Sequence, residues 1–355
     1  MKPSITFEDE FGAGTFFIWI NIRLLSHDSM QLINTISLLT SSCALAQQPA
    51  RFETSVVPLP NEDMASSCPY TLTIPYPKDP IRAVWVIFDR GHDVHDLYSD
   101  PVILEFARSF RLALLLHGHC PGKAPENRRD MNMDPEKGLG RALFTALDQF
   151  GQITGHRELA DTRLIFLAFS GAGPLSARFV RSVPDRVIAA ILSAPGHHDP
   201  HGIDTVNLDT RTLAVPQMII AGAADNISGT SRPYEYFRKH SEQGARWSFV
   251  LQNKSPHCCT ANAKELMLQW LGTVLKQTQP SSMHAALCKM NQDDGWFALM
   301  KIKETEIKDS FGLRTFELAD AKIRKSKDDN PQEWLPAGWL ASHALAEEWL
   351  AFVRP

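Results

Sequence analysis

Short apolar runs alternate with amphipathic stretches between residues 66 and 277 of the chain. Six of the runs have the length and content of buried strands, and they end in residues suited to turns. These six runs are 83–91, 111–120, 162–169, 186–196, 216–225 and 246–257, and a weaker strand pattern precedes them at 68–77. Between the runs, apolar residues recur at helical spacing, as in Leu139, Ala142, Leu143, Ala146, Leu147 and Phe150. The alternation predicts an α/β fold whose mostly parallel sheet is covered by helices on both faces.

The end of the chain follows a different pattern. Residues 277–284 have the composition of a linker, and the sequence after them predicts two strands joined around residues 309–312. A helix is expected to close the chain at 339–353. We therefore expect a core over residues 47–277 and a C-terminal extension over 278–355, which packs on the core and contributes a strand pair and a helix.

The first 46 residues predict a leader segment. A short apolar stretch follows Met30 and ends in Ala44-Leu45-Ala46, which is typical of a signal-peptide cleavage site. We expect residues 1–46 to be a leader whose true start is Met30, and the protein to be secreted or periplasmic. No Lys or Arg lies between Met30 and the apolar stretch, so the alternative is a loosely ordered arm and a cytoplasmic protein.

Charge and length exclude some partners of the 355-residue chain. The formal net charge is −4 and the Lys and Arg residues are scattered, so no basic stripe is available to bind nucleic acid. A stable membrane span needs about 20 consecutive apolar residues, and the sequence has no such run.

Cysteine spacing argues against a structural zinc site, because the sequence contains no C-x-x-C motif. Of the six cysteines, five remain if a leader ends at Ala46. In an exported protein we expect one or two disulfides around Cys258, Cys259 and Cys288. Their connectivity stays open at this point.

Three residues with catalytic chemistry follow three of the predicted strands. Ser170 follows the strand at 162–169, Asp225 ends the strand at 216–225, and His257 ends the strand at 246–257. Because the carboxyl ends of parallel strands meet at one edge of a sheet, we expect the three to converge. Structural alternatives are a helix N-cap for Ser170, a turn residue for Asp225 and a helix-start residue for His257.

The segment Ala168-Phe169-Ser170-Gly171-Ala172 resembles the nucleophile elbow of the α/β-hydrolase superfamily, in particular its esterase and lipase-type serine hydrolases. Alanine replaces the first glycine of the motif, and the resemblance covers residues 66–277. It implies that Ser170 is the nucleophile, His257 the general base and acid, and Asp225 the residue that orients the imidazole. No cofactor is implied.

The resemblance also implies an oxyanion hole with two backbone donors. One would be the N–H of Gly171, directly after the nucleophile. The family spacing places the other in the loop that contains Arg90 and Gly91. The His117-Gly118 pair has the usual composition of that loop but follows the next strand.

Histidines are concentrated after three of the strands. They stand on loops at residues 92–96, 117–119 and 197–201. Their spacing matches no regular metal-binding pattern, so we expect no metal. The residues that we expect to line the substrate site are His92, His119, His197 and His198.

The predicted function is that of an exported serine hydrolase that cleaves carboxylic esters through an acyl-enzyme intermediate. The expected substrate is a small-molecule or polymer-borne ester. The same three residues would also suit a peptidase or amidase, and a catalytically silent binding scaffold is an alternative of another class. A metal-dependent hydrolase built on the histidine loops is the third alternative.

Overall fold

The computed structural model describes most of the chain after residue 48. The described residues are 49–76, 78–88, 92–123, 134–196, 208–278, 287–288, 290, 295–306, 314–325 and 334–354, with only the backbone for 92–93 and 304–306. The expected leader at 1–46 lies outside the described residues. Within them, no helix has the length and apolar character that crossing a membrane requires.

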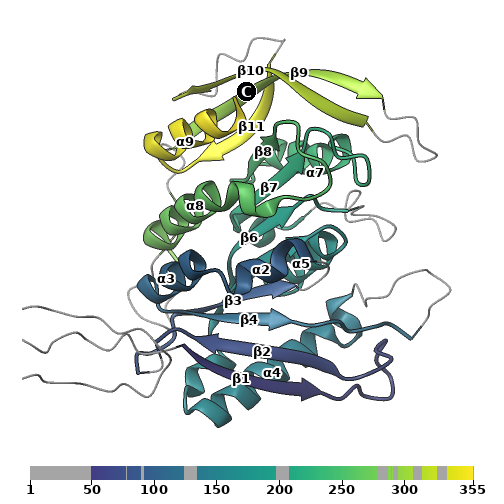
Figure 1. Ribbon diagram of the computed structural model, residues 1–355, viewed down its shortest axis with the longest axis vertical. Helices are drawn as coiled ribbons and strands as arrows, with labels where there is room; N and C mark the ends of the chain where they lie inside the picture. Colours follow the sequence, from purple (N-terminus) through teal and green to yellow (C-terminus); the bar gives the residue numbers. More distant parts are fainter. Residues whose placement is uncertain are drawn as a thin grey trace, which may run out of the picture. The chain divides into compact units, whose positions relative to one another are not determined.

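One sheet of eleven strands runs through the described residues (Figure 1). Its spatial order is β1-β2-β4-β3-β5-β6-β7-β8-β11-β9-β10. The strands are β1 (Ala50–Val56), β2 (Cys68–Ile74), β3 (Ala83–Phe88), β4 (Leu112–His117), β5 (Arg163–Phe169), β6 (Val187–Ser193), β7 (Gln217–Gly222), β8 (Ser248–Gln252), β9 (Trp296–Glu306), β10 (Arg314–Arg324) and β11 (Leu335–Leu340).

The central strands are parallel, from β4 through β3, β5, β6 and β7 to β8. Antiparallel pairing begins on either side, at β2 and at β11. Every residue of β3, β4, β6, β7 and β8 is buried, as expected for strands covered on both faces. The prediction of a mostly parallel sheet built from the six apolar runs is confirmed.

The helices are α2 (His92–Tyr98), α3 (Pro101–Ser109), α4 (Leu139–Thr154), α5 (Ala172–Ser182), α6 (Thr210–Ala214), α7 (Ser231–Glu242), α8 (Lys264–Gln277) and α9 (His343–Val353). In the sheet, β4 lies on one side of β3, and β5, β6, β7 and β8 follow in order on the other side. The connection from β3 to β4 therefore runs in the opposite direction to the connections from β4 to β8. Because such crossovers are right-handed, α3 covers one face while α4, α5 and α7 cover the other. The helix α8 packs beside α3, since Gly272 lies against Phe106 and Phe110.

The C-terminal extension contains the expected strand pair, β9 and β10, and the expected helix, α9. The helix begins at His343 rather than at residue 339, because Trp339 and Leu340 belong to β11. This strand lies between β8 and β9, and its Trp339 N–H donates to the Trp247 carbonyl at 2.9 Å. Strand pairing therefore overrides the helical spacing of residues 339 and 340. The helix α9 is capped by Ser342, whose hydroxyl accepts from the Leu345 N–H.

Two other local predictions are wrong. Residues 92–96 were expected in a loop, but the backbone there forms α2. The strand expected to reach His257 ends at Gln252, where its carbonyl accepts from the Ala223 and Ser255 N–H groups and the chain turns. The edge strand β1 has no counterpart in the sequence-based prediction, because its sequence contains no continuous apolar run.

Candidate active site

Ser170 occupies the turn between β5 and α5, and its φ is 53°. A positive φ is costly for serine, so the surrounding hydrogen bonds must hold it there. Its N–H donates to the Ser193 carbonyl at 3.0 Å, and its own carbonyl accepts from the N–H groups of Gly173 (3.0 Å) and Gly196 (2.8 Å). These bonds fix the side chain at the carboxyl end of β5.

Small residues allow the chain to approach this turn closely. A Cβ on Gly173 would lie 2.6 Å from the Pro195 Cβ, and one on Gly196 would lie 3.4 Å from the Gly171 Cα. Ala172, at the first position of α5, is fully buried. Small residues are therefore required by the packing around Ser170.

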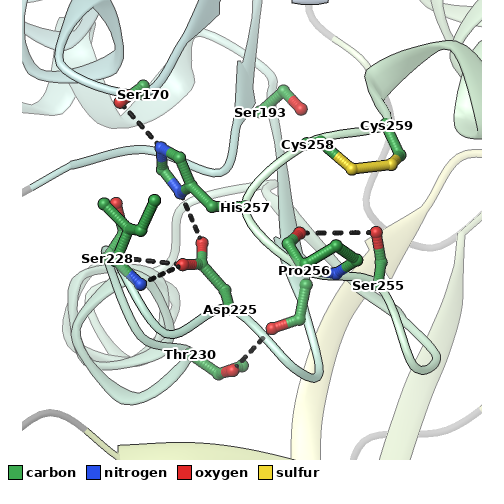
Figure 2. Close-up of polar contacts among 12 residues, drawn as sticks. Ser170, Ser193, Asp225, Ser228, Thr230, Ser255, Pro256, His257, Cys258 and Cys259 are labelled. Atoms are coloured by element: carbon green, nitrogen blue, oxygen red, sulfur yellow. Dashed lines mark hydrogen bonds and ion pairs between the residues drawn. A yellow bond between two sulfur atoms is a disulfide. The ribbon is translucent and has the colours of Figure 1, made fainter.

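Asp225 lies in the turn after β7 and is fully buried. Its Oδ1 accepts from the N–H groups of Ile227 (2.9 Å) and Ser228 (2.8 Å), and its Oδ2 lies 2.8 Å from the Nδ1 of His257 (Figure 2). The backbone bonds satisfy one carboxylate oxygen and orient the other toward the imidazole.

His257 lies between Asp225 and Ser170. Its Nε2 is 2.9 Å from the Ser170 Oγ, and its side chain is 10% exposed. Because the Nδ1–H donates to the Asp225 carboxylate, the Nε2 is left as the acceptor for the Ser170 hydroxyl. The three side chains thus form one hydrogen-bonded chain through which the imidazole can take the hydroxyl proton.

The loop before His257 packs directly on the end of β7. The Ala224 N–H donates to the Ser255 carbonyl at 2.8 Å, and a Cβ on Gly222 would lie 2.7 Å from the Pro256 carbonyl oxygen. Only glycine leaves room for this approach. The contact brings the segment that carries His257 next to the turn that carries Asp225.

The other candidate residues are placed less fully. Gly171 is the N-cap residue of α5, adjacent to Ser170. His119 is exposed beyond the end of β4. Arg90, Gly91, His197 and His198 lie outside the described residues, and only the backbone of His92 is described, as the first residue of α2.

His117 was expected on a loop, but it is the last residue of β4 and is fully buried. Its ring lies 5.0 Å from the rings of Tyr70 and Phe88. Burial lowers the pKa of His117 to about 4, so the imidazole is neutral at neutral pH. Across the described part of the chain, no three His, Cys, Asp or Glu side chains are grouped so that they could hold a metal ion.

Two disulfides lie in the described part of the chain. Cys68 and Cys120 join β2 to the segment after β4, with their Cα atoms 5.0 Å apart. This bond was missed, although the antiparallel pairing of Tyr70 with His117 explains why the two cysteines meet. Cys258 and Cys259 are bonded to each other directly after His257.

Comparisons with known proteins find similar solved structures but no similar sequence. No protein-family model matches the chain, and no curated protein matches it in sequence. Among solved structures, an esterase from Pyrobaculum calidifontis is 13% identical, with a TM-score of 0.43 and coverage of 69% of this chain and 91% of that chain. An S-formylglutathione hydrolase from Staphylococcus aureus is 11% identical, with a TM-score of 0.45 and coverage of 64% and 100%. The fluorophosphonate-binding serine hydrolase F from Staphylococcus aureus is 11% identical, with a TM-score of 0.43 and coverage of 64% and 99%.

The topology itself identifies the fold. A parallel sheet is preceded by an antiparallel β2, a serine stands in a strained turn between β5 and α5, and an aspartate and a histidine follow β7 and β8 in that order. The chain has the α/β-hydrolase fold, extended at its C-terminus by β9, β10, β11 and α9.

Proposed function

We propose that the protein is a serine hydrolase that cleaves carboxylic esters through an acyl-enzyme intermediate. The observation that carries the proposal is the hydrogen-bonded chain from Asp225 to His257 (2.8 Å) and from His257 to Ser170 (2.9 Å). Both distances lie within the reach needed for proton transfer between a nucleophile and its base.

In the proposed reaction, the Ser170 Oγ attacks the ester carbonyl while its proton passes to the His257 Nε2. Asp225 holds the imidazole in the required tautomer and stabilises the imidazolium that forms. The imidazolium then gives its proton to the departing alcohol, which leaves an acyl group on Ser170. Water, deprotonated by His257, attacks this acyl group and releases the acid, so that Ser170 recovers its proton.

The negative oxygen of the tetrahedral intermediate needs preorganised N–H donors. We propose the Gly171 N–H as one donor, because it follows Ser170 at the start of α5. We propose the segment of Arg90 and Gly91 as the second, since Phe88 at the end of β3 pairs with Ala168 near the end of β5. His92, His119, His197 and His198 remain the proposed lining of the substrate site.

Esters are the proposed substrates rather than amides, because an alcohol leaves more readily than an amine. A peptidase with the same three residues is the alternative. A panel of acyl-matched esters and amides separates the two: hydrolysis of the amides at rates near those of the esters would favour the peptidase.

We also propose that the protein works in an oxidising compartment outside the cytoplasm. The Cys68–Cys120 and Cys258–Cys259 disulfides support this, because such bonds persist where thiols are not kept reduced. Fractionation of the producing cells, with N-terminal sequencing of the protein, tests it. Recovery in the cytoplasm with both bonds reduced would contradict the proposal.

The experiment that tests the enzymatic function is labelling with a fluorophosphonate, followed by intact mass and peptide mapping. We expect one adduct, on Ser170, in the wild type and none in Ser170→Ala. In His257→Ala, labelling should slow by a factor of about a thousand or more. The absence of an adduct on folded wild-type protein, or an adduct elsewhere in the chain, would contradict the assignment.

A further inference from the structure

The Cys258–Cys259 disulfide lies next to the candidate active site (Figure 2). It joins adjacent residues, so the two side chains and the peptide between them form a small closed ring. Cys259 has a φ of 73°, in the region that residues other than glycine rarely adopt. Both cysteines are partly exposed, so a small thiol in solution can reach them.

His257 is at the centre of a tight turn that leads directly into this ring. The Cys258 N–H donates to the Pro256 carbonyl at 2.8 Å, which leaves His257 as the middle residue of a three-residue turn. The direction of the imidazole therefore depends on how the chain is held before and after the turn. Before it, the chain is held by the packing of Pro256 on Gly222 described above.

After the turn, the ring is the first point of attachment. The Cys259 carbonyl accepts from the Gln252 side-chain amide at 2.9 Å and from the Asn262 N–H at 3.0 Å. The Gln252 side chain is itself buried at the end of β8. The positive φ of Cys259 turns its carbonyl toward these donors, and the ring restricts the backbone to that conformation.

The attachment continues to the nucleophile. Thr260 is fully buried, and its Oγ1 lies 2.6 Å from the Ser193 Oγ. The backbone carbonyl of Ser193 accepts the N–H of Ser170 at 3.0 Å. A second path therefore connects Ser170 with His257, through Ser193, Thr260 and the backbone of Cys258 and Cys259. The disulfide ring restricts the conformation of that backbone.

We propose that the Cys258–Cys259 disulfide is a positioning element for His257, and that its reduction slows the reaction of Ser170. The proposal rests on the proposed serine-hydrolase function. Without the ring, the turn gains conformational freedom and the imidazole spends less time within reach of the Ser170 Oγ. A displacement of about 1 Å at a catalytic group can cost a hundredfold in rate.

The co-reactant is a dithiol. One of its thiolates attacks a sulfur of the Cys258–Cys259 bond, forms a mixed disulfide with that cysteine and releases the other cysteine as a thiolate. The second thiolate of the dithiol then attacks the mixed disulfide and releases the remaining cysteine. The sulfur–sulfur bond of the protein breaks, each cysteine ends as a thiol, and the dithiol becomes a disulfide. Cys68 and Cys120 are both fully buried, so their bond should resist the same reagent in the folded protein.

The test compares oxidised wild type, dithiol-treated wild type and a variant with both Cys258→Ser and Cys259→Ser. The measurements are the rate of fluorophosphonate labelling at Ser170, the kcat and KM for one ester, and the unfolding midpoint. Peptide mapping after thiol alkylation reports which bonds are reduced. A Cys288→Ser variant serves as the matched control, because it removes an exposed cysteine without touching the turn.

Reduction should slow labelling and lower kcat by a factor of about 10 to 100, with a much smaller change in KM, and reoxidation should restore the rate. The double variant should be equally slow and should not respond to the dithiol, whereas Cys288→Ser should respond like the wild type. Unchanged labelling in the double variant, or in wild type whose Cys258 and Cys259 are mapped as thiols, would overturn the proposal. No labelling of folded, oxidised wild type would instead refute the serine-hydrolase function.

Discussion

Gly173 lies against Pro195 so closely that a Cβ on the glycine would come within 2.6 Å of the proline Cβ. Gly173 also donates its N–H to the Ser170 carbonyl at 3.0 Å. Gly173 therefore stabilises the strained turn at Ser170. Its lack of a side chain also leaves space for the segment of Ser193 and Pro195, whose Ser193 carbonyl accepts the Ser170 N–H.

The first prediction is that Gly173→Ala lowers both stability and activity. The added methyl group must displace backbone and a rigid ring, so we expect a loss of about 1–3 kcal/mol in the free energy of unfolding. Ester hydrolysis should fall by more than tenfold if Ser170 shifts by about 1 Å. Denaturant unfolding and steady-state kinetics measure the two effects. Gly122→Ala is the control, because its Cβ would meet Asp63 at an ordinary 3.5 Å; equal effects in both variants would contradict the argument.

A second prediction concerns Asp225→Asn. The Asn oxygen can still accept from Ile227 and Ser228, but its amide then donates to the His257 Nδ1. The Nε2 would consequently carry the proton and could not accept the one from Ser170. We expect kcat to fall by about ten-thousandfold with little change in KM.

The matched control for this change is Asp209→Asn. Asp209 caps α6, and its carboxylate accepts from the Thr212 N–H at 2.8 Å, just as the Asp225 carboxylate accepts from backbone N–H groups. Its replacement should leave kcat unchanged. A kcat for Asp225→Asn within tenfold of the wild type would refute the role assigned to Asp225.

The sequence was sufficient to predict the elements that depend on local patterns. The buried strands β3 to β8 coincide with the six apolar runs. A local signal also marks the start of α3, where Asp100 accepts from the Val102 and Ile103 N–H groups. The order of Ser170, Asp225 and His257 along the chain was also visible, because each follows its own strand. What could be predicted was therefore that these three residues lie together at one edge of the sheet.

Features that depend on pairing between distant segments could not be predicted. The helical spacing of Trp339 and Leu340 gave no sign of β11, which forms because β8 and β9 offer it hydrogen-bond partners. The Cys68–Cys120 bond required the antiparallel register of β2 on β4. The link from Ser193 to Thr260 joins side chains 67 residues apart, and neither residue has a local signal for it.

A third prediction follows from the burial of His117. The pKa of this imidazole is about 4 in the folded protein, against 6.5 for a free histidine. Between these values the unfolded chain binds a proton that the folded protein does not, so stability falls as pH decreases from 6.5 to 4. The full effect is about 3 kcal/mol. In His117→Gln this part of the pH dependence should disappear, as unfolding measured across the same range would show; an unchanged slope would mean that other groups cause it.

The fourth prediction concerns Glu62, which joins the segment between β1 and β2 to α4. Its carboxylate accepts from the Arg141 side chain, with the Nη2 at 2.6 Å, and from the Leu59 N–H at 2.7 Å, and its side chain is only 8% exposed. The hydrogen bond from Arg141 holds the pKa of Glu62 below the usual 4.5. The pair therefore stabilises the fold above pH 4.5, and this contribution is lost as pH falls through the lowered pKa.

The change that tests the pair is Glu62→Gln. It should lower the free energy of unfolding at neutral pH by about 1.5–3 kcal/mol, because the partly buried Arg141 loses its counter-charge. The difference from wild type should shrink as the solution is acidified, since the wild-type carboxylate then becomes neutral as well. Glu53→Gln is the control: its pair with Arg51 is exposed and should contribute less than about 1 kcal/mol. A difference between Glu62→Gln and wild type that stays constant from neutral to acid pH would show that packing, rather than charge, is what Glu62 contributes.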